Sequence, residues 1–408
     1  MRIFTAVRHS LDPRQFYGGL WSGNFYPALR RLGHEIVEST TDLLPASYFM
    51  DVAGTFDSQQ REIRARITES IVSEIKAAHQ NQPLDLCLFY FYNAHFDPAG
   101  FDEIHALGAP TINFFCNSIF QFELVEAMAR KATFSWHAER DARASYLAVG
   151  AKPIWVQMAA DPGVYHPVDI GTRRPRAVFA GMNYADRSDL MASLIRAQVP
   201  VEIYGPGWGV NRTNTPAPTS SSAQPVSQRG TSSGTLGSYG KLVWDTLKRK
   251  GVAAPKRLLR QWQVRQKQRQ LMPLFIPHAK GAVPFTELAK IFSSYEMCLN
   301  FSNVWSDGRP GSDLIPHVRL RDFEAPMCRT CYLTGYTDEL AGFYELGKEV
   351  ETYATADELV DKAKFYLANP VAAERLREAG FERALRDHTW DRRFEELFSK
   401  VGMTASAP

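Results

Sequence analysis

The sequence predicts an α/β protein built from two Rossmann-like units, and three observations support this. The chain has 408 residues, more than a single hydrophobic core usually serves. It opens with a strand–helix–strand pattern. Residues 84–92 form a nearly continuous apolar run, as expected of a strand in a parallel sheet covered on both faces.

The first elements follow from alternating apolar runs and turn residues. Residues 2–7 predict a strand, 18–24 a glycine-containing loop, 25–32 a helix and 35–38 a second strand. The loop contains Gly19 but lacks the G-x-G-x-x-G spacing of a dinucleotide-binding turn. A tight strand-to-helix turn is therefore one interpretation of this loop.

Later elements of the first unit place polar residues after strands. A helix is predicted over 58–79, and strands are predicted over 84–92, 110–116, 132–136 and 152–158. Ligands of open α/β sheets bind at the carboxyl ends of the strands. His95 and Asn117, which follow the first two of these runs after the helix, are therefore candidates for a cleft. The next run ends at His137 and Glu139.

The second unit begins with a strand over 176–181, followed by a helix that starts near Arg187 and a strand over 201–204. Residues 211–240 are rich in Ser, Thr, Pro and Gly and predict a mobile surface excursion. Residues 241–270 predict a basic helix. Such a helix can lie on an anionic membrane, or it can be a solvated helix packed on its domain by an apolar side.

The charge, the cysteine spacing and the lack of long apolar runs limit the classes of function that the sequence allows. A net charge of +3 is too small to indicate nucleic-acid binding. The five cysteines lack the spacing of a disulfide framework, and Cys328-x-x-Cys331 lacks the further ligands of a zinc site, so buried thiols are expected. The sequence shows neither a signal peptide nor an apolar run of spanning length, which predicts a bacterial cytoplasmic protein, free or docked on a membrane surface.

The most informative segment lies at 317–340. Arg319 and Arg321 can grip phosphates, because a guanidinium matches phosphate oxygens and keeps its charge. Glu324 can accept hydrogen bonds from ribose hydroxyls. Together they predict a nucleotide-linked ligand. The alternative from this segment alone is a surface helix with ordinary charges.

Several motifs in order give the C-terminal part a family resemblance. They are R-D-F-E-A at 321–325 followed by L-T-G-Y at 333–336, the segment 281–302, and the closing pattern at 367–390 that ends in H-T-W-x-x-R. Residues 276–398 thereby resemble the C-terminal domain of GT-B glycosyltransferases, and most closely the CgeB-like, spore-maturation-type branch of the retaining enzymes.

The resemblance implies a GT-B architecture, with two Rossmann-like domains facing a central cleft. The expected divisions are an N-terminal, acceptor-side domain at 1–168, a nucleotide-sugar-binding domain at 169–389 with an insertion at about 211–270, and a helix at 390–408 that crosses back to the first domain. The implied activity is transfer of a sugar from a nucleotide-diphosphate donor to a sugar, lipid-linked or protein acceptor, retaining and without a metal or other cofactor.

The resemblance also assigns roles to residues. His95 and Asn117 would face the transferred sugar or the acceptor, and the 18–24 loop would line the cleft through Gly19, Trp21 and Asn24. In the strand–glycine–arginine turn, Arg187 would hold the diphosphate. The full expected donor set is Gly181, Asn183, Arg187, Gly281, Ala282, Val283, Asp307, Arg319, Arg321 and Glu324.

One position departs from the family pattern. Retaining relatives carry a second glutamate eight positions before the one that corresponds to Glu324, where this chain has Pro316. Retention of configuration is therefore open, and the segment around Asp307 is the expected substitute contact to the sugar. Two alternatives also stay open: a nucleotide-sugar 2-epimerase using His95, His137 and Glu139, and a non-catalytic nucleotide-sugar-binding protein.

Overall fold

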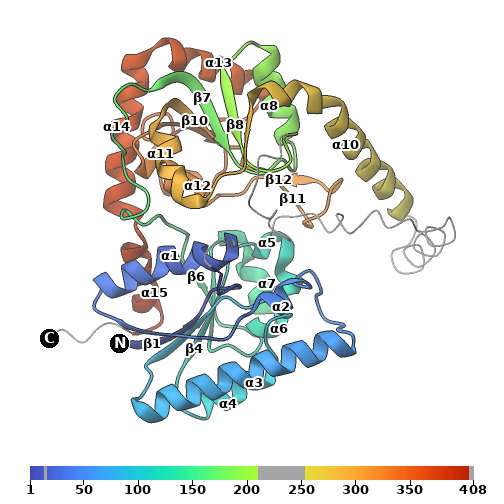
Figure 1. Cartoon of the computed structure of the whole chain (residues 1–408), viewed down its shortest axis with the longest axis vertical. Helices are drawn as coiled ribbons and strands as arrows, with labels where there is room; N and C mark the ends of the chain where they lie inside the picture. The colour runs from blue at the N-terminus through green and yellow to red at the C-terminus, as the bar shows by residue number, and fades with distance from the viewer. Residues whose placement is uncertain (13–15, 210–252, 404–408) are drawn as a thin grey trace.

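The computed structural model describes residues 1–12, 16–209 and 253–403, which form two lobes (Figure 1). Each lobe contains a six-stranded parallel sheet flanked by helices. The strand orders are β2-β1-β3-β4-β5-β6 and β14-β13-β10-β7-β8-β9. The predicted α/β class with two parallel sheets is confirmed.

The first sheet brings its apolar strands into the centre of the lobe. Every residue of β1, β3 and β4 is buried, which explains the continuous apolar runs. The strands are β1 (Arg2–Ala6), β2 (Glu35–Glu38), β3 (Leu86–Phe89), β4 (Thr111–Phe115), β5 (Phe134–His137) and β6 (Pro153–Trp155). The helices around them are α1 (Phe16–Arg31), α2 (Leu44–Ser47), α3 (Ser58–Asn81), α4 (Ala99–His105), α5 (Ser118–Gln121), α6 (Glu126–Ala129) and α7 (Arg143–Ala148).

The prediction of a loop at 18–24 is wrong, because α1 already runs through this segment. Trp21, Phe25 and Leu29 recur every fourth residue and are all buried, so the helix presents one apolar stripe to the core. This burial outweighs the low helix propensity of Gly18, Gly19 and Gly23, because tertiary packing overrides a weak local preference.

The second lobe repeats the strand–helix pattern with an added hairpin. Its sheet strands are β7 (Arg174–Ala180), β8 (Val201–Tyr204), β9 (Ala279–Gly281), β10 (Tyr295–Leu299), β13 (Cys331–Gly335) and β14 (Glu351–Tyr353), and β11 (Val304–Trp305) pairs with β12 (Leu314–Ile315) as the hairpin. Its helices are α8 (Arg187–Arg196), α10 (Ala253–Phe275), α11 (Leu288–Ser293), α12 (Arg321–Met327), α13 (Ala356–Ala368) and α14 (Pro370–Asp387).

The predicted excursion at 211–240 lies outside the described residues. So does the first part of the predicted basic helix. Its described part, α10, continues past the predicted end to Phe275 and points outward from the second lobe (Figure 1). None of the described helices is both long and apolar enough to cross a membrane.

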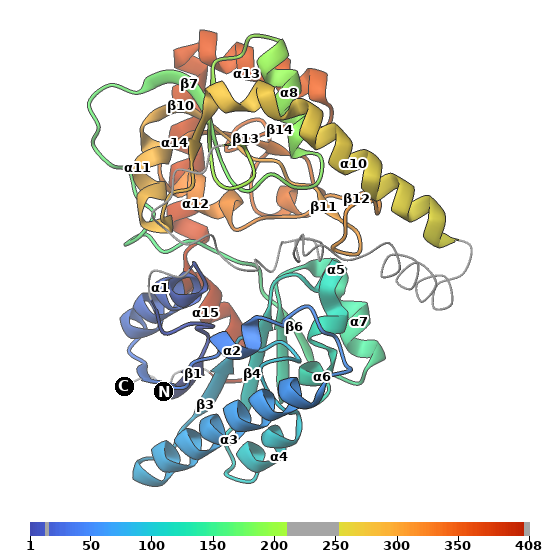
Figure 2. The same cartoon turned by 45° about the vertical axis from the view of Figure 1, so that its right-hand side comes forward.

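Two chain segments cross between the lobes side by side. Ala160 forms a parallel bridge with Thr389, and the chain then continues into α15 (Trp390–Lys400), which lies against α1 of the first lobe (Figure 2). Arg31 of α1 pairs with Asp161 at 2.6 Å and with Asp391 at 2.5 Å. One side chain of the first lobe therefore fastens both crossing segments.

Candidate functional site

Glycine-rich turns lie along the carboxyl edge of the second sheet. The Gly181 amide donates to Tyr204 O at 2.8 Å, and the Gly205 amide donates to Gly281 O at 2.9 Å. Gly205 has a φ of 125°, and a Cβ there would lie 2.3 Å from Gly181 O, so only glycine permits this approach. Ala282 and Val283 follow at the outer strand β9. The predicted residues 181 and 281–283 are thus brought to one edge.

Arg187, which is expected to bind the diphosphate, makes hydrogen bonds to the backbone at this edge of the sheet. Its Nη1 donates to Met182 O at 2.9 Å and its Nη2 to Phe301 O at 3.2 Å, which joins the carboxyl ends of β7 and β10. The side chain is buried, and burial lowers its pKa to about 10. Asn183 is engaged in a similar way: its Nδ2 donates to Gly207 O at 3.0 Å. Both side chains shape the turn.

Arg321 and Glu324 pair with each other at the start of α12. Arg321 Nη1 lies 2.5 Å from Glu324 Oε2, and the Glu324 side chain is only 3% exposed. Burial raises the pKa of Glu324, and the adjacent guanidinium opposes that shift. A ribose contact by Glu324 would therefore need its other oxygen, Oε1.

Arg319 keeps unused hydrogen-bond donors. Its Nε and Nη2 are buried and have no partner within the described residues. The guanidinium carbon lies 5.4 Å from the centre of the Tyr184 ring, which also contacts Arg187 at 4.2 Å. Burial lowers the pKa of Arg319 to about 10, so the group stays charged at neutral pH. The Tyr184 hydroxyl also lacks a partner in this part of the chain.

The first lobe meets this region through Glu139, just after β5. Glu139 Oε1 lies 3.0 Å from His317 Nε2 of the second lobe, and Oε2 accepts from the Ser118 amide at 2.8 Å. Both members of the pair have side chains that are 2% exposed. His317 Nδ1 has no partner among the described residues. We call Glu139, His317, Arg319 and Tyr184 the junction cluster.

The two predicted catalytic residues have different surroundings. Asn117 stands at the N-cap position of α5, at the carboxyl end of β4, without a side-chain capping bond. It directly precedes Ser118 and so lies beside the junction cluster. His95 is fully buried inside the first lobe, 3.1 Å from Ser47 Oγ and with its ring 4.2 Å from that of His9. Burial holds its pKa well below the usual value. The expectation that His95 faces the cleft is therefore wrong.

The expected cleft loop is also wrong in its contacts. Trp21 and Asn24 lie on α1, and Asn24 is fully buried. Asn24 Oδ1 accepts from Trp390 Nε1 at 3.0 Å, so it holds α15 rather than facing a ligand. Gly19 lies on the same helix and forms no strand-to-helix turn. Gly23 of this helix lies near the second lobe, because an added Cβ there would lie 3.8 Å from the Phe285 side chain.

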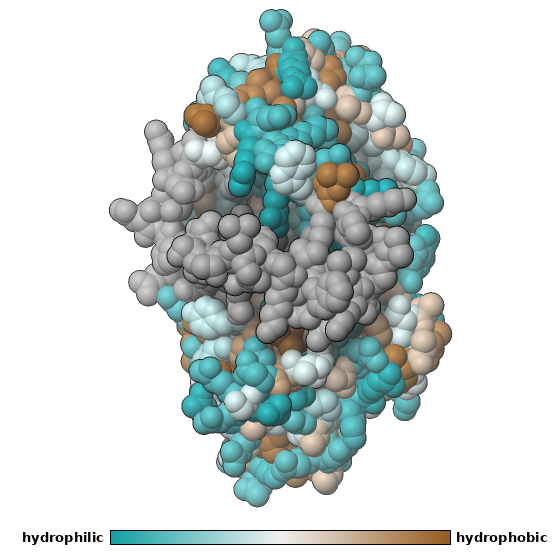
Figure 3. Space-filling model, turned by 90° about the vertical axis from the view of Figure 1, so that its right-hand side faces the viewer, coloured by the Kyte–Doolittle hydropathy of each residue, from teal (hydrophilic) through white to brown (hydrophobic). Residues whose placement is uncertain are grey.

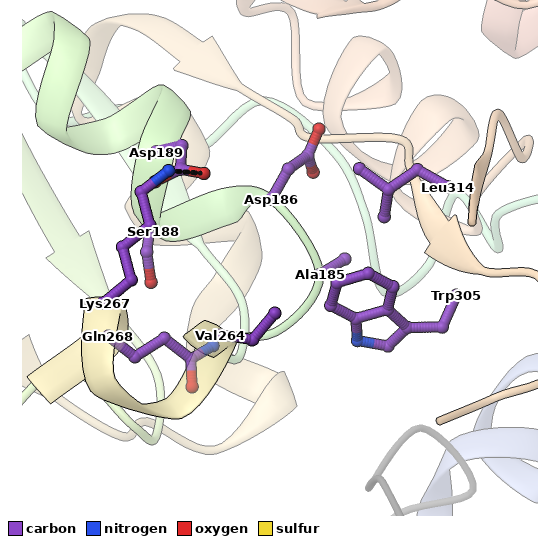
Figure 4. A pocket seen from close by; sticks show the side chains of 9 residues that line it. All are labelled: Ala185, Asp186, Ser188, Asp189, Val264, Lys267, Gln268, Trp305 and Leu314. Carbon is purple, nitrogen blue, oxygen red and sulfur yellow. Dashed lines mark hydrogen bonds and ion pairs between the residues drawn. The ribbon is translucent and has the colours of Figure 1, made fainter. Parts of the chain in front are cut away.

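Asp307 lies at the tip of the β11–β12 hairpin and pairs with Arg257 of α10. Nearby, a cavity is lined by Phe120, Gln121, Tyr184, Val304, Trp305 and Gly308, so it borders both lobes. A second cavity lies between α8, α10 and Trp305 (Figure 4). In this cavity Lys267 forms an ion pair with Asp189 at 2.8 Å. Its charge is therefore neutralised by a protein partner, which makes it a weak candidate for binding phosphate.

No group of three or more His, Cys, Asp or Glu side chains within residues 1–12, 16–209 and 253–403 is arranged to hold a metal ion. The five cysteines are all buried and free, which agrees with the prediction of buried thiols. Burial raises the pKa of the Cys331 thiol to about 12, so this thiol is not a ready nucleophile.

The comparison with protein families gives one match, which lies in the C-terminal part of the chain. Residues 249–399 match a family model described as Glycosyl transferase-like. The matched part contains α10 to α15, with Arg319, Arg321 and Glu324. No curated protein matches the chain by sequence.

Solved structures show the GT-B fold over the whole chain. Sucrose-phosphate synthase from Thermosynechococcus elongatus matches with a TM-score of 0.54 and 12% identity, covering 99% of both chains. HepE of Anabaena, solved with UDP and glucose, matches with a TM-score of 0.52 and 10% identity, also over 99% of both chains. A proposed UDP-N-acetylglucosamine 2-epimerase from Listeria monocytogenes matches with a TM-score of 0.51 and 11% identity, covering 99% of this chain and 97% of that one. The predicted GT-B fold is thus confirmed.

Sequence reasoning missed two members of the junction cluster as site residues. Tyr184 stands in the turn between β7 and α8, and His317 begins the informative segment. The sequence could have indicated both residues as site candidates. Tyr184 follows β7 and His317 precedes α12, and ligands of such sheets bind at the carboxyl ends of the strands. Their contact with the first lobe could not be read from spacing along the chain.

Proposed function

We propose that the protein is a glycosyltransferase that moves a sugar from a nucleotide-diphosphate donor to an alcohol acceptor. The observation that carries the proposal is Arg319, a charged group with two buried N–H donors that are unused within the described residues, at the junction of the lobes. It belongs to the part of the chain that matches the glycosyl transferase-like family model. Transfer creates negative charge on the leaving diphosphate, and a fixed cation in an enclosed site stabilises it strongly.

In this proposal the donor lies along the carboxyl edge of the second sheet. Arg319 binds the diphosphate, and the turns at Gly181 and Gly281 leave room for the backbone to approach the nucleotide. Glu324 holds the ribose through Oε1. Arg187 and Arg321 support these groups through the contacts already described, and the acceptor enters from the side of the first lobe.

UDP is the first nucleotide to test, because the Anabaena neighbour was solved with UDP and glucose. The CgeB-like relationship and independence from metal remain part of the proposal, whereas Pro316 stands where retaining relatives carry a glutamate, so both retention and inversion are tested. The stereochemical course is measured by NMR of the fresh product, and metal dependence by adding a chelator.

A nucleotide-sugar 2-epimerase is the second candidate, because the fold is shared with a proposed enzyme of that kind. Epimerisation needs acid–base groups that are free to reach the sugar. Glu139 uses Oε1 for His317 and Oε2 for the Ser118 amide, so its carboxylate is occupied. The carboxylate that the epimerase alternative names is therefore engaged in structural contacts, and this favours transfer over epimerisation.

The decisive experiment has two stages. The purified protein is first screened for thermal stabilisation by UDP-, GDP-, dTDP- and CMP-sugars. The sugar that stabilises it most is then incubated with and without a panel of p-nitrophenyl glycosides and glycerol, and the products are identified by mass spectrometry and NMR. A glycoside product supports the proposal. An epimerised donor without acceptor, or binding without any turnover, would replace it with one of the alternatives.

Peripheral membrane contact through the basic helix is also proposed, as a route to a lipid-linked acceptor. Leu259 and Trp262 of α10 are 55% and 58% exposed. They stand three residues apart and therefore on the same side of the helix. Arg265 and Arg269 are on the following turns. An apolar pair beside cations suits an anionic lipid surface. Figure 3 shows this side of the molecule, where hydrophilic side chains gather over the upper lobe.

A further inference from the structure

The contact between Glu139 and His317 joins the two lobes. The proposed donor site uses neither of these side chains. The two side chains meet at 3.0 Å in a buried position. His317 does not belong to the donor set that the sequence indicates. We propose that His317, oriented by Glu139, accepts the proton of the acceptor hydroxyl during transfer. The inference rests on the proposed function and names the group that activates the acceptor.

The hydrogen bonds fix which imidazole nitrogen is available. With Nε2–H donating to Glu139 Oε1, the lone pair lies on Nδ1, and this atom has no partner among the residues described. Glu139 is held in place by the Ser118 amide. This is the arrangement of a general base: a carboxylate fixes the tautomer and direction of an imidazole whose other nitrogen receives a proton.

The surroundings place this nitrogen near the expected reaction. Arg319 stands two residues from His317, and its N–H groups without partners in the described chain suit the leaving diphosphate. The Phe120 ring lies 5.8 Å from the His317 ring and also lines the cavity that Tyr184 borders. The proton acceptor and the cation for the leaving group therefore share one enclosed region.

The step balances without a further reagent. The acceptor oxygen forms a bond to the anomeric carbon while the bond from that carbon to the diphosphate oxygen breaks. The bonding electron pair leaves with the diphosphate, which Arg319 stabilises. The proton of the acceptor hydroxyl moves to His317 Nδ1, and Glu139 stabilises the resulting imidazolium.

Because its members belong to different lobes, the couple exists only when the lobes are closed. An open molecule would separate His317 from Glu139 and lose the orienting carboxylate. Proton acceptance by His317 thus depends on the contact between the two lobes.

The test compares H317N, E139Q and the double variant H317N/E139Q with the wild type. H105N is the matched control, because His105 hydrogen-bonds Thr111 at the amino end of β4, the end opposite the junction. Each protein is assayed for UDP binding by calorimetry, for thermal stability, and for kcat of transfer from the UDP-sugar that stabilises the wild type most.

The expected result is a loss in kcat of about 100-fold or more for H317N, with UDP affinity unchanged within about threefold. E139Q should lose less, and the double variant should be no slower than H317N, since the two residues act as one unit. H105N should transfer at the wild-type rate. If H317N is too unstable to assay, E139Q still tests the inference. A wild-type kcat in E139Q would show that Glu139 does not orient a catalytic His317.

Other outcomes also overturn the inference. They are an H317N variant that keeps wild-type kcat, losses that add in the double variant, or a parallel loss of UDP affinity and kcat. These are distinguishable from failure of the proposed function. In that case the wild type itself would neither bind nor turn over any nucleotide sugar, and both proposals would fall together.

Discussion

At the scale of single residues, three arginines near the carboxyl edge of the second sheet have different roles. Arg187 donates from Nη1 and Nη2 to two backbone carbonyls and leaves only Nε without a partner, and Arg321 pairs with Glu324. Arg319 lacks partners at both Nε and Nη2 in the described part of the chain. An arginine whose terminal nitrogens are already used supports the protein, whereas one with an unused buried terminal nitrogen is ready for a ligand.

Replacing Arg319 should therefore affect the ligand. R319A should weaken UDP binding about 10- to 100-fold, since a hydrogen bond to a charged group contributes about 1.5–3 kcal/mol. Uridine affinity should change much less, and R319K should recover only part of the loss, because lysine lacks the guanidinium fork. Calorimetric titrations with UDP and uridine check this. Equal losses for the two ligands would contradict a diphosphate role.

Replacing Arg321 should instead affect stability. R321A leaves the Glu324 carboxylate buried without its partner, which should cost about 3 kcal/mol of unfolding free energy. Combining it with E324Q should restore most of that loss, since the buried carboxylate charge is then gone. Thermal melts of R321A, R321A/E324Q and R319A provide the comparison. A melt of R321A as high as that of the wild type would show that the pair is not a support.

At the scale of elements, α15 joins the second lobe to the first. Trp390, Phe394 and Leu397 are fully buried, and Trp390 bonds Asn24 of α1. We predict that truncation after Thr389 lowers the melting temperature and abolishes transfer, although no proposed donor contact is removed. W390F, which loses the hydrogen bond and part of the buried indole ring, should cost about 2–4 kcal/mol. A truncated protein with full activity would contradict the bracing role.

The outward face of α10 gives a second prediction at this scale. The wild type should float with vesicles containing phosphatidylglycerol and not with pure phosphatidylcholine, and added salt should release it. L259S/W262S should lose flotation while keeping UDP affinity, because the pair is exposed on α10 and is separate from the junction cluster. L147S, which changes an exposed leucine of the first lobe, is the control. Flotation that is equal for all variants would exclude α10 as the contact.

At the scale of the whole molecule, buried histidines make stability depend on pH. Burial lowers the pKa of His388 to about 3 and that of His9 to about 4, from a usual value of 6.5. His388 accepts at Nδ1 from Arg393 Nη2 at 3.0 Å, so the native contact requires a neutral ring. Below pH 6.5 the unfolded chain binds more protons than the folded one. Stability present above that pH is therefore lost as the pH falls.

The expected slope is about 1.4 kcal/mol per pH unit for each such histidine. The melting temperature of the wild type should fall from pH 7 to pH 5. H388N should be less stable at pH 7 but show a smaller fall. H166N, at an exposed histidine, should follow the wild type. An identical fall in all three proteins would show that His388 does not contribute.

The sequence by itself determined most of the local elements and the class of fold. Apolar runs such as 84–92 indicate buried parallel strands, because alternation disappears when both faces of a sheet are covered. The segment around Arg319, Arg321 and Glu324 stood out because its residue types match the chemistry of phosphate and ribose. These are properties of short stretches, which spacing along the chain records.

Only the tertiary structure decided which of these side chains are free. Residues 18–24 are helical because Trp21 and Asn24 pack against α15, which comes from the other end of the chain. The terminal nitrogens of Arg187 and the Nη1 of Arg321 have partners that the fold brings to them, whereas a terminal nitrogen of Arg319, Nη2, has no partner among the described residues. The His317–Glu139 pair spans 178 positions and two lobes. Such contacts depend on how the lobes meet, and hydrogen bonding at that junction is set by three-dimensional proximity rather than by sequence pattern.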